Sequence, residues 1–144
     1  KPLQSNFPIW IGGSSDAAIQ RTAKFGTGWI AGLQDPDQIA ATIAGIKLAL
    51  TNEARTIADD HYGATLIYQY KPRQADEHAL LQNNGVRKIA VCGDSDAIVK
   101  RIKHYIESGV SKFVAIPLAN SDQDFIFQTR YLINEVLPEI NQLQ

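Results

Sequence analysis

Two glycines and two serines follow a short apolar run near the start of the chain. Residues 8–16 read PIWIGGSSD, and a helical pattern begins at Ala17, which predicts a strand, a tight turn and a helix N-terminus. Such a turn presents unpaired backbone N–H groups and the positive end of a helix dipole at one place. Glycine also lets the backbone approach a ligand closely. The turn is therefore a candidate site for a phosphate or another anion, with a plain βα turn capped by a serine as the alternative; its residues are Gly12, Gly13, Ser14 and Ser15.

Two tyrosines lie at alternate positions near the end of a strand expected at residues 64–70. In a βα barrel, one architecture considered below, the carboxyl ends of the strands form the active-site face. In that architecture, Tyr68 or Tyr70 is a candidate to line a substrate site. Packing in the core is the alternative, and it is the commoner role of tyrosines in strands.

The histidines show no pattern of metal ligands. His61 lies beside two aspartates at the start of its strand, which is the end opposite the expected chemistry. His78 and His104 lack partners at ligand spacing, so we expect no metal site. The sequence identifies no catalytic residues, which stay unknown.

The composition is that of an ordinary globular protein, with 144 residues, 44% hydrophobic and 20% charged, and a net charge of -1. This length predicts a single domain, residues 1–144, with a real core. The small charge argues against nucleic acid as the main partner, and the apolar runs are too short for a membrane span. The single cysteine, Cys92, excludes an internal disulfide and indicates a reducing compartment, the cytoplasm. Because the chain contains no methionine, we expect that the polypeptide begins before Lys1.

Strands and helices are expected to alternate along the chain. The expected strands are residues 9–11, 29–31, 64–70 and 112–117, and the expected helices cover 16–24, 35–50, 94–108 and 122–138. A short helix is possible at 75–82, and 83–85 read as a break. The last helix is expected to turn one set of residues inward: Phe125, Thr129, Leu132, Ile133 and Val136.

Four consecutive βα units predict an α/β fold with a parallel sheet and right-handed crossovers. Two architectures agree with this pattern, a small doubly wound sheet or four of the eight units of a TIM (β/α)8 barrel. A complete barrel takes about 250 residues, so this chain could supply only half of one. Periodicity alone leaves both open.

Several landmarks, in order, resemble the C-terminal half of the luciferase-like monooxygenase family, the flavin- or F420-dependent βα barrels. PIWIGGSS at 8–15 resembles the fifth strand and its loop, and FGTGWI at 25–30 resembles the family's GDGW sixth strand, with Thr27 in place of the usual acid. DHYG at 60–63 resembles the entry to the seventh strand. GDSDAI at 93–98 and GVSKFV at 109–114 resemble the last long helix and the eighth strand.

The resemblance implies a role for this chain in coenzyme binding. It places residues 12–15 at the phosphate of FMN or F420, and it implies that the backbone at Ala31 and Gly32 helps to close the same pocket, although Gly32 is equally suited to a turn. It implies a flavin- or F420-dependent oxidoreductase or monooxygenase acting on a small organic substrate. A non-catalytic flavin- or phosphate-binding barrel fragment, or a structural partner, is the alternative. Since four parallel strands leave two unpaired edges, we expect a homo-oligomer or association with the missing N-terminal half.

Overall fold

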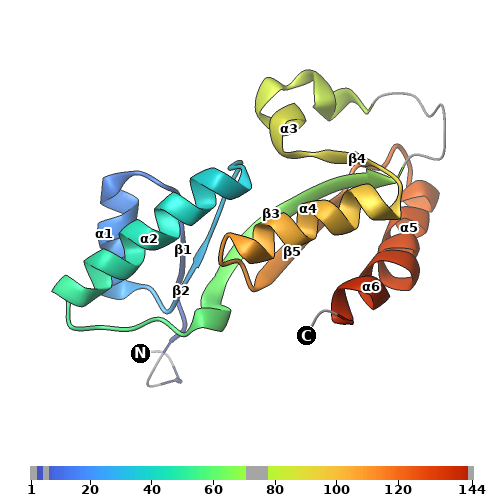
Figure 1. Cartoon of the computed structure of the whole chain (residues 1–144). Coiled ribbons are helices and arrows are strands. Elements are labelled where there is room, and N and C mark those ends of the chain that lie inside the picture. The colour runs from blue at the N-terminus through green and yellow to red at the C-terminus, as the bar shows by residue number, and fades with distance from the viewer. Residues whose placement is uncertain (1–2, 5–6, 71–77, 143–144) are drawn as a thin grey trace. The chain divides into compact units, whose positions relative to one another are not determined.

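The computed structural model describes residues 3–4, 7–70 and 78–142, in which strands alternate with helices (Figure 1). The strands are β1 (Trp10–Gly12), β2 (Gly28–Ile30), β3 (Tyr62–Tyr70), β4 (Val91–Gly93) and β5 (Lys112–Pro117). The longer helices are α1 (Asp16–Phe25), α2 (Pro36–Asn52), α4 (Ser95–Glu107) and α5 (Asp122–Tyr131). The shorter ones are α3 (Asn84–Ile89), α6 (Leu137–Asn141), the 3-10 turns η1 (Asp59–His61) and η2 (Ala79–Gln82), and the π-helical η3 (Leu132–Val136). None of the helices in these ranges is long and apolar enough to cross a membrane.

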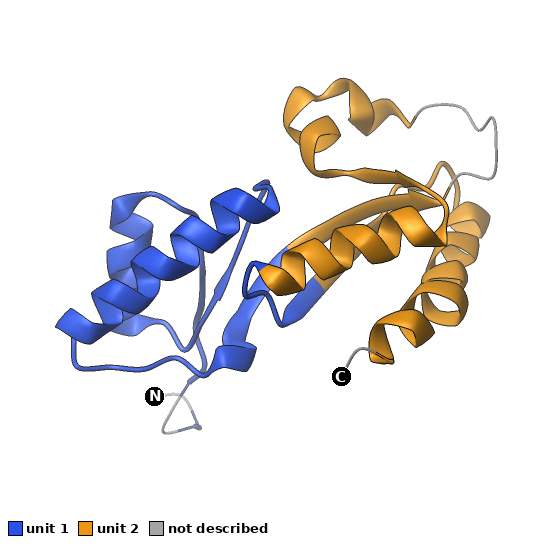
Figure 2. Ribbon diagram, in the orientation of Figure 1, with its two compact units in different colours: residues 1–64, 108–113 blue, residues 65–107, 114–144 orange. Residues whose placement is uncertain are grey.

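The chain divides into two compact units, which Figure 2 distinguishes by colour. Unit 1 comprises residues 1–64 and 108–113, and unit 2 comprises residues 65–107 and 114–144. The boundary falls within β3 and β5, so both strands contribute residues to each unit. The sequence-based expectation of a single domain remains a prediction.

In unit 1, parallel strands pack against two helices. β1 pairs with β2 and β2 pairs with the start of β3, both in parallel. Helix α2 begins at an Asp35 N-cap that forms a capping box with Gln38, and Pro36 occupies its first turn. One face of α2 is buried at positions spaced by four, three and four residues; Ile39, Ile43, Ile46 and Leu50 are all at most 6% exposed. Helix α1 approaches α2 closely where Ile19 lies against Gly45.

In unit 2, the end of β3 pairs in parallel with β4, and residues 66–69 are buried. Helix α4 begins after Asp94, whose side chain accepts a hydrogen bond from the backbone N–H of Ala97 at 3.0 Å. Ile98, Ile102 and Tyr105 of α4 are buried. The three-residue strand β4 and helix α3 were not predicted, and part of the helix considered at 75–82 lies outside the described residues.

The predicted inward face of the last helix is partly wrong. Phe125 and Ile133 are 51% and 53% exposed, whereas the buried positions are Gln128, Leu132, Val136 and Ile140. These four positions are spaced by four residues throughout. The π-helical hydrogen bonding of η3 widens the turn, so that a four-residue spacing stays on one face where a regular helix would drift away from it.

Candidate functional site

The turn between β1 and α1 has the conformation that its glycines predict. Gly13 has φ +98°, a left-handed conformation that favours glycine. Ser15 is the N-cap of α1, and its hydroxyl oxygen accepts a hydrogen bond from the backbone N–H of Ala18 at 3.3 Å. The Ser15 side chain therefore caps the helix. The Ser14 hydroxyl is the other hydroxyl of the turn, and it does not cap the helix.

An indole from the neighbouring strand holds this turn in place. Trp29 of β2 is completely buried, and its Nε1–H donates to the backbone oxygen of Gly13 at 2.8 Å. In a trans peptide the C=O and the following N–H point in opposite directions. Because the Gly13 carbonyl faces the indole, the N–H of Ser14 points away from it.

A cavity of about 440 Å³ lies beside the turn in unit 1. Its walls come from the turn, the loop after β2 and the first half of α2, and its lining residues are Ser14, Leu33, Gln34, Gln38, Ala41 and Thr42. The Thr42 hydroxyl donates to the Gln38 backbone oxygen at 2.9 Å and accepts from Nε2 of Gln34 at 3.3 Å. The lining thus combines four polar side chains with Leu33 and Ala41 and contains no charged side chain.

The two small residues after β2 lie at the same end of the strands as the turn, because Gly12 pairs with Ile30. Ala31 is 1% exposed, and its backbone N–H donates to the oxygen of Gly63 at 2.8 Å. Gly32 is exposed, and a Cβ added to it would meet no atom within 4 Å. The structure thus brings residues 12–15 and 31–32 to one edge of unit 1. The Ala31 N–H is already bound to Gly63, so it is not a free donor for a ligand.

Tyr68 and Tyr70 both contact helix α5 of unit 2. The Tyr68 hydroxyl is buried and donates to the backbone oxygen of Gln128 at 3.2 Å, and burial raises the pKa of this phenol. The ring of Tyr70 stacks on Tyr131 with centroids 3.5 Å apart and planes at 17°. Both tyrosines therefore serve packing, the alternative weighed from the sequence. Their role in lining a substrate site stays a prediction.

The residue between these tyrosines was not singled out from the sequence. Gln69 is 2% exposed, and its Oε1 has no hydrogen-bond partner among the described residues. Successive side chains of a strand point to opposite faces, so Gln69 lies on the face opposite Tyr68 and Tyr70. A polar side chain within an apolar strand is the sequence signal that could have identified it.

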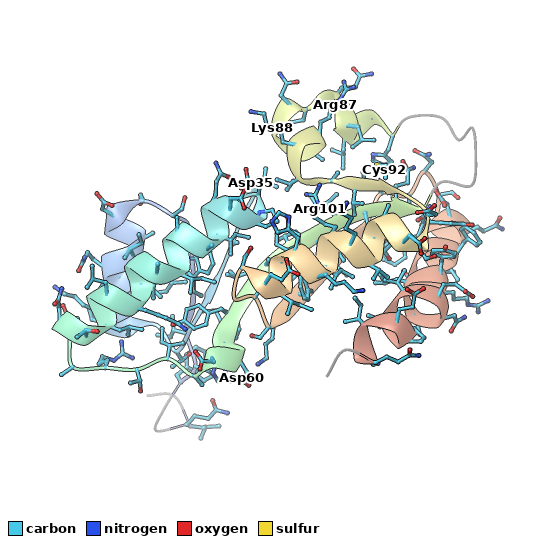
Figure 3. All side chains as sticks on the ribbon, in the orientation of Figure 1. Asp35, Asp60, Arg87, Lys88, Cys92 and Arg101 are labelled. Carbon is cyan, nitrogen blue, oxygen red and sulfur yellow. The ribbon has the colours of Figure 1, made fainter. Side chains whose placement is uncertain are left out.

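The start of β3 holds a cluster of charged and aromatic side chains in unit 1 (Asp60 is labelled in Figure 3). Lys112 Nζ donates to Asp60 Oδ2 at 3.0 Å, and this hydrogen bond holds the pKa of the Asp60 carboxyl below its usual value. His61 lies 3.4 Å from Asp60 and meets the Trp10 ring edge-to-face. These contacts give His61 a structural setting at the amino end of its strand, as expected from its position.

The strands and helices described above define a parallel βα protein, and the comparisons with known proteins give its relatives. Residues 1–71 match the model of the luciferase-like monooxygenase family. This match confirms the resemblance drawn from the sequence. No curated protein matches the chain.

Solved structures of similar fold include enzymes of several activities. An F420-dependent secondary alcohol dehydrogenase in complex with an F420–acetone adduct is 12% identical, with a TM-score of 0.68 over 94% of this chain and 50% of the other. The coenzyme F420-dependent tetrahydromethanopterin reductase from Methanopyrus kandleri is 12% identical, with a TM-score of 0.66 over 92% of this chain and 50% of the other. A riboflavin lyase with modified FMN and riboflavin is 16% identical, with a TM-score of 0.69 over 92% and 42%.

These similarities concern the fold. The chain spans about half the length of the solved structures that it resembles. The fold class predicted from the sequence, consecutive βα units that form half of a (β/α)8 barrel, is confirmed.

Proposed function

We propose that this chain holds the coenzyme phosphate and forms half of the barrel wall of a flavin- or F420-dependent oxidoreductase or monooxygenase. The family match over residues 1–71 supports this class, as do the F420 and FMN named for similar structures. FMN would supply oxygen activation and F420 would supply hydride transfer. The protein would bind and orient the coenzyme for a small organic substrate.

The observation that carries the proposal is the fixed orientation of the peptide between Gly13 and Ser14. The Trp29 indole binds the carbonyl, so the Ser14 N–H is directed away from the protein core. The Ser14 side chain lines the 440 Å³ cavity, and the N-terminus of α1 adds its positive dipole end. An N–H, a hydroxyl and a helix terminus are the donors that a phosphate needs.

Gly12, Gly13, Ser14 and Ser15 would form the phosphate turn, and Ala31 and Gly32 would contribute space. No atom lies within 4 Å of a Cβ added to Gly32, and the Ala31 N–H already binds Gly63. These two residues would therefore contribute through their small size and not through hydrogen bonds. Asp16 follows the turn in the first position of α1 and is exposed. Its carboxylate would have to point away from a bound dianion.

The test compares the two glycines that have positive φ among the described residues. Gly13→Val and Gly109→Val place the same side chain at φ +98° and φ +94°, so both variants carry similar backbone strain. We expect Gly13→Val to weaken the affinity for FMN or F420 at least tenfold, measured by fluorescence titration. Gly109→Val, in the loop before β5, serves as the control and should retain the affinity.

Ser14→Ala provides a second variant that keeps the backbone intact. Ser14 is exposed and its change should leave stability unaltered while it weakens coenzyme binding severalfold. Unchanged affinity for both FMN and F420 in Gly13→Val and Ser14→Ala would refute the phosphate site.

The partner proposal rests on apolar side chains exposed on two strands. Ile9 and Trp10, beside and in β1, are 44% and 37% exposed, and Val114 and Ile116 in β5 are 49% and 41% exposed. We propose that the N-terminal half of the barrel, or a second copy of the chain, covers them in the cytoplasm. A folded monomer in light scattering would contradict this association.

The alternative function is a barrel fragment that binds a flavin or a phosphate without turnover. The chain matches only about half the length of the similar enzymes, and this observation favours the binding fragment as a second candidate. Oxidation of bound reduced coenzyme in the presence of candidate substrates separates the two functions, because a binding module would hold the coenzyme without accelerating its oxidation.

A further inference from the structure

Two buried glutamines in unit 2 differ in how their carboxamides are satisfied. Gln128 of α5 is 3% exposed, and its Oε1 accepts the backbone N–H of Tyr70 at 2.7 Å. Its Nε2 donates to the Tyr70 oxygen and to Asp124 Oδ1, both at 3.2 Å. Gln69 of β3 is 2% exposed, and its Oε1 has no partner in the described part of the chain.

An unpaired buried acceptor is unfavourable for folding. Its desolvation lowers the folding equilibrium constant by roughly tenfold or more, because the lost hydrogen bond to water is not replaced. Gln128 avoids this cost through three hydrogen bonds. Gln69 Oε1 forms no such bond among the described residues, which leaves it available to accept a hydrogen bond from a ligand.

Gln69 lies near the end of its strand. It is the penultimate residue of β3, at the carboxyl end of the strand, where the binding groups of βα barrels lie. Its neighbours Tyr68 and Tyr70 contact α5 on the other face of the strand. On its own face, Ile67 packs into an apolar cluster with Leu81, Ile89 and Leu118.

The adjacent strand shows where this face meets solvent. Cys92 of β4 is the register partner of Gln69, so the two backbones lie about 4.8 Å apart and the two side chains share a face of the sheet. Cys92 is exposed and is labelled in Figure 3. A ligand at this edge would therefore lie beside both residues.

We propose that Gln69 recognises the amide or imide edge of a bound ligand, with Oε1 accepting a hydrogen bond from a –CO–NH– group. A carboxamide carries an acceptor and a donor side by side, and this arrangement is complementary to such an edge. The pyrimidine edge of a flavin ring is an imide of this kind, so the inference rests on the proposed coenzyme function. Gln69 would then be a binding residue for the ring of such a ligand.

The test uses riboflavin, which lacks the phosphate, and 3-methylriboflavin, in which a methyl group replaces the imide hydrogen. We expect the wild-type protein to bind riboflavin about tenfold more tightly than its methylated form. Gln69→Met, which keeps the length of the side chain, should bind riboflavin about tenfold more weakly and lose the discrimination. Equal binding of the two ligands by the wild type, no riboflavin binding, or discrimination retained in Gln69→Met would overturn the proposal.

Two further readouts do not depend on activity. In urea unfolding of the ligand-free protein, Gln69→Met should have an unchanged or higher midpoint, whereas the control Gln128→Met should have a lower one. A lower midpoint for Gln69→Met would mean that Gln69 forms a structural hydrogen bond, and the proposal would fail. Riboflavin should also slow the alkylation of Cys92 by iodoacetamide, a specific label because the chain has one cysteine, and an unchanged rate would refute this location.

The experiments distinguish failure of the Gln69 proposal from failure of the proposed coenzyme function. If Gly13→Val weakens FMN binding while Gln69→Met leaves riboflavin binding and discrimination intact, the phosphate turn stands and the role of Gln69 is refuted. If the wild type binds neither FMN nor F420, the proposed function falls, and the inference about the ring falls with it.

Discussion

Replacing Gly28 by alanine tests how unit 1 packs its strands. Gly28 of β2 is the register partner of Trp10 in β1. A Cβ at Gly28 would lie 2.6 Å from Cε2 and 2.7 Å from Cδ2 of Trp10. Carbon atoms pack best at about 3.5–4.0 Å, so the indole would have to move by about 1 Å. The same indole lies against Gly63, where an added Cβ would approach it to 3.2 Å.

The size of the effect follows from this displacement. Forcing an extra methyl group into a packed site costs about 1–3 kcal/mol. Trp10 is 37% exposed and can give way toward solvent, which favours the middle of this range, about 2 kcal/mol. With a urea m-value of about 2 kcal/mol/M, the unfolding midpoint of unit 1 should fall by about 1 M.

The assay is a double-mutant cycle of Gly28→Ala and Trp10→Leu. Urea unfolding of each variant is monitored by the fluorescence of Trp29. Trp29 remains as the only tryptophan in the Trp10→Leu background, and it is completely buried in unit 1. Gly28→Ala should cost no more than about 0.5 kcal/mol once the indole is absent, which gives a coupling energy of at least about 1 kcal/mol. An equal loss in both backgrounds would show that the indole does not limit the site.

Two other predictions concern individual hydrogen bonds. Asp60 has a lowered pKa because of its hydrogen bond from Lys112, so the stabilisation of this pair is present above the usual value of 3.8 and is lost as the pH falls through the lower folded value. Lys112→Gln should raise the Asp60 pKa toward 3.8 in a carboxyl NMR titration, and a pKa that does not move would contradict the assignment. Tyr68→Phe removes the bond to the Gln128 oxygen and should lower the free energy of unfolding by about 1 kcal/mol in urea, with no change in riboflavin affinity. Weaker riboflavin binding would instead support the substrate-lining role expected from the sequence.

Elements with strong local signals could be predicted from the sequence. The expected strand at 112–117 coincides with β5, and the start of the helix expected at 35–50 coincides with the observed N-cap of α2, Asp35. In both cases the signal lies within the element itself, as a β-branched run or as a cap followed by an apolar stripe. Such signals are short in range and do not depend on the partner strand.

Elements that depend on pairing escaped prediction. Strand β4 was not predicted, and it is defined by the pairing of Val91–Gly93 with Tyr68–Tyr70. Asn83, which reads as a break, is the N-cap of α3, where its side chain accepts the backbone N–H groups of Gly85 and Val86. A cap and a turn share the same residue types, so the sequence could not separate them.

The candidate site was predictable in part. The glycine and serine turn was recognised because its residue types report backbone conformation directly. The alternation along β3 could have assigned Gln69 to the face opposite Tyr68, but only the structure shows that its Oε1 has no hydrogen-bond partner in the part of the chain that is described. The bond from Trp29 to Gly13 joins residues 16 positions apart, and its existence follows from the strand register.

That bond also decides what can be transferred between proteins. The conformation of the turn is held by a donor on the next strand, so residues 12–15 grafted onto another strand and helix would lack the group that orients their peptide. The smallest portable module is the whole β1–α1–β2 segment. For the same reason, sequence changes in the turn and at position 29 are expected to be interdependent during evolution or redesign. Libraries that vary the turn for a new anion should therefore vary Trp29 together with it.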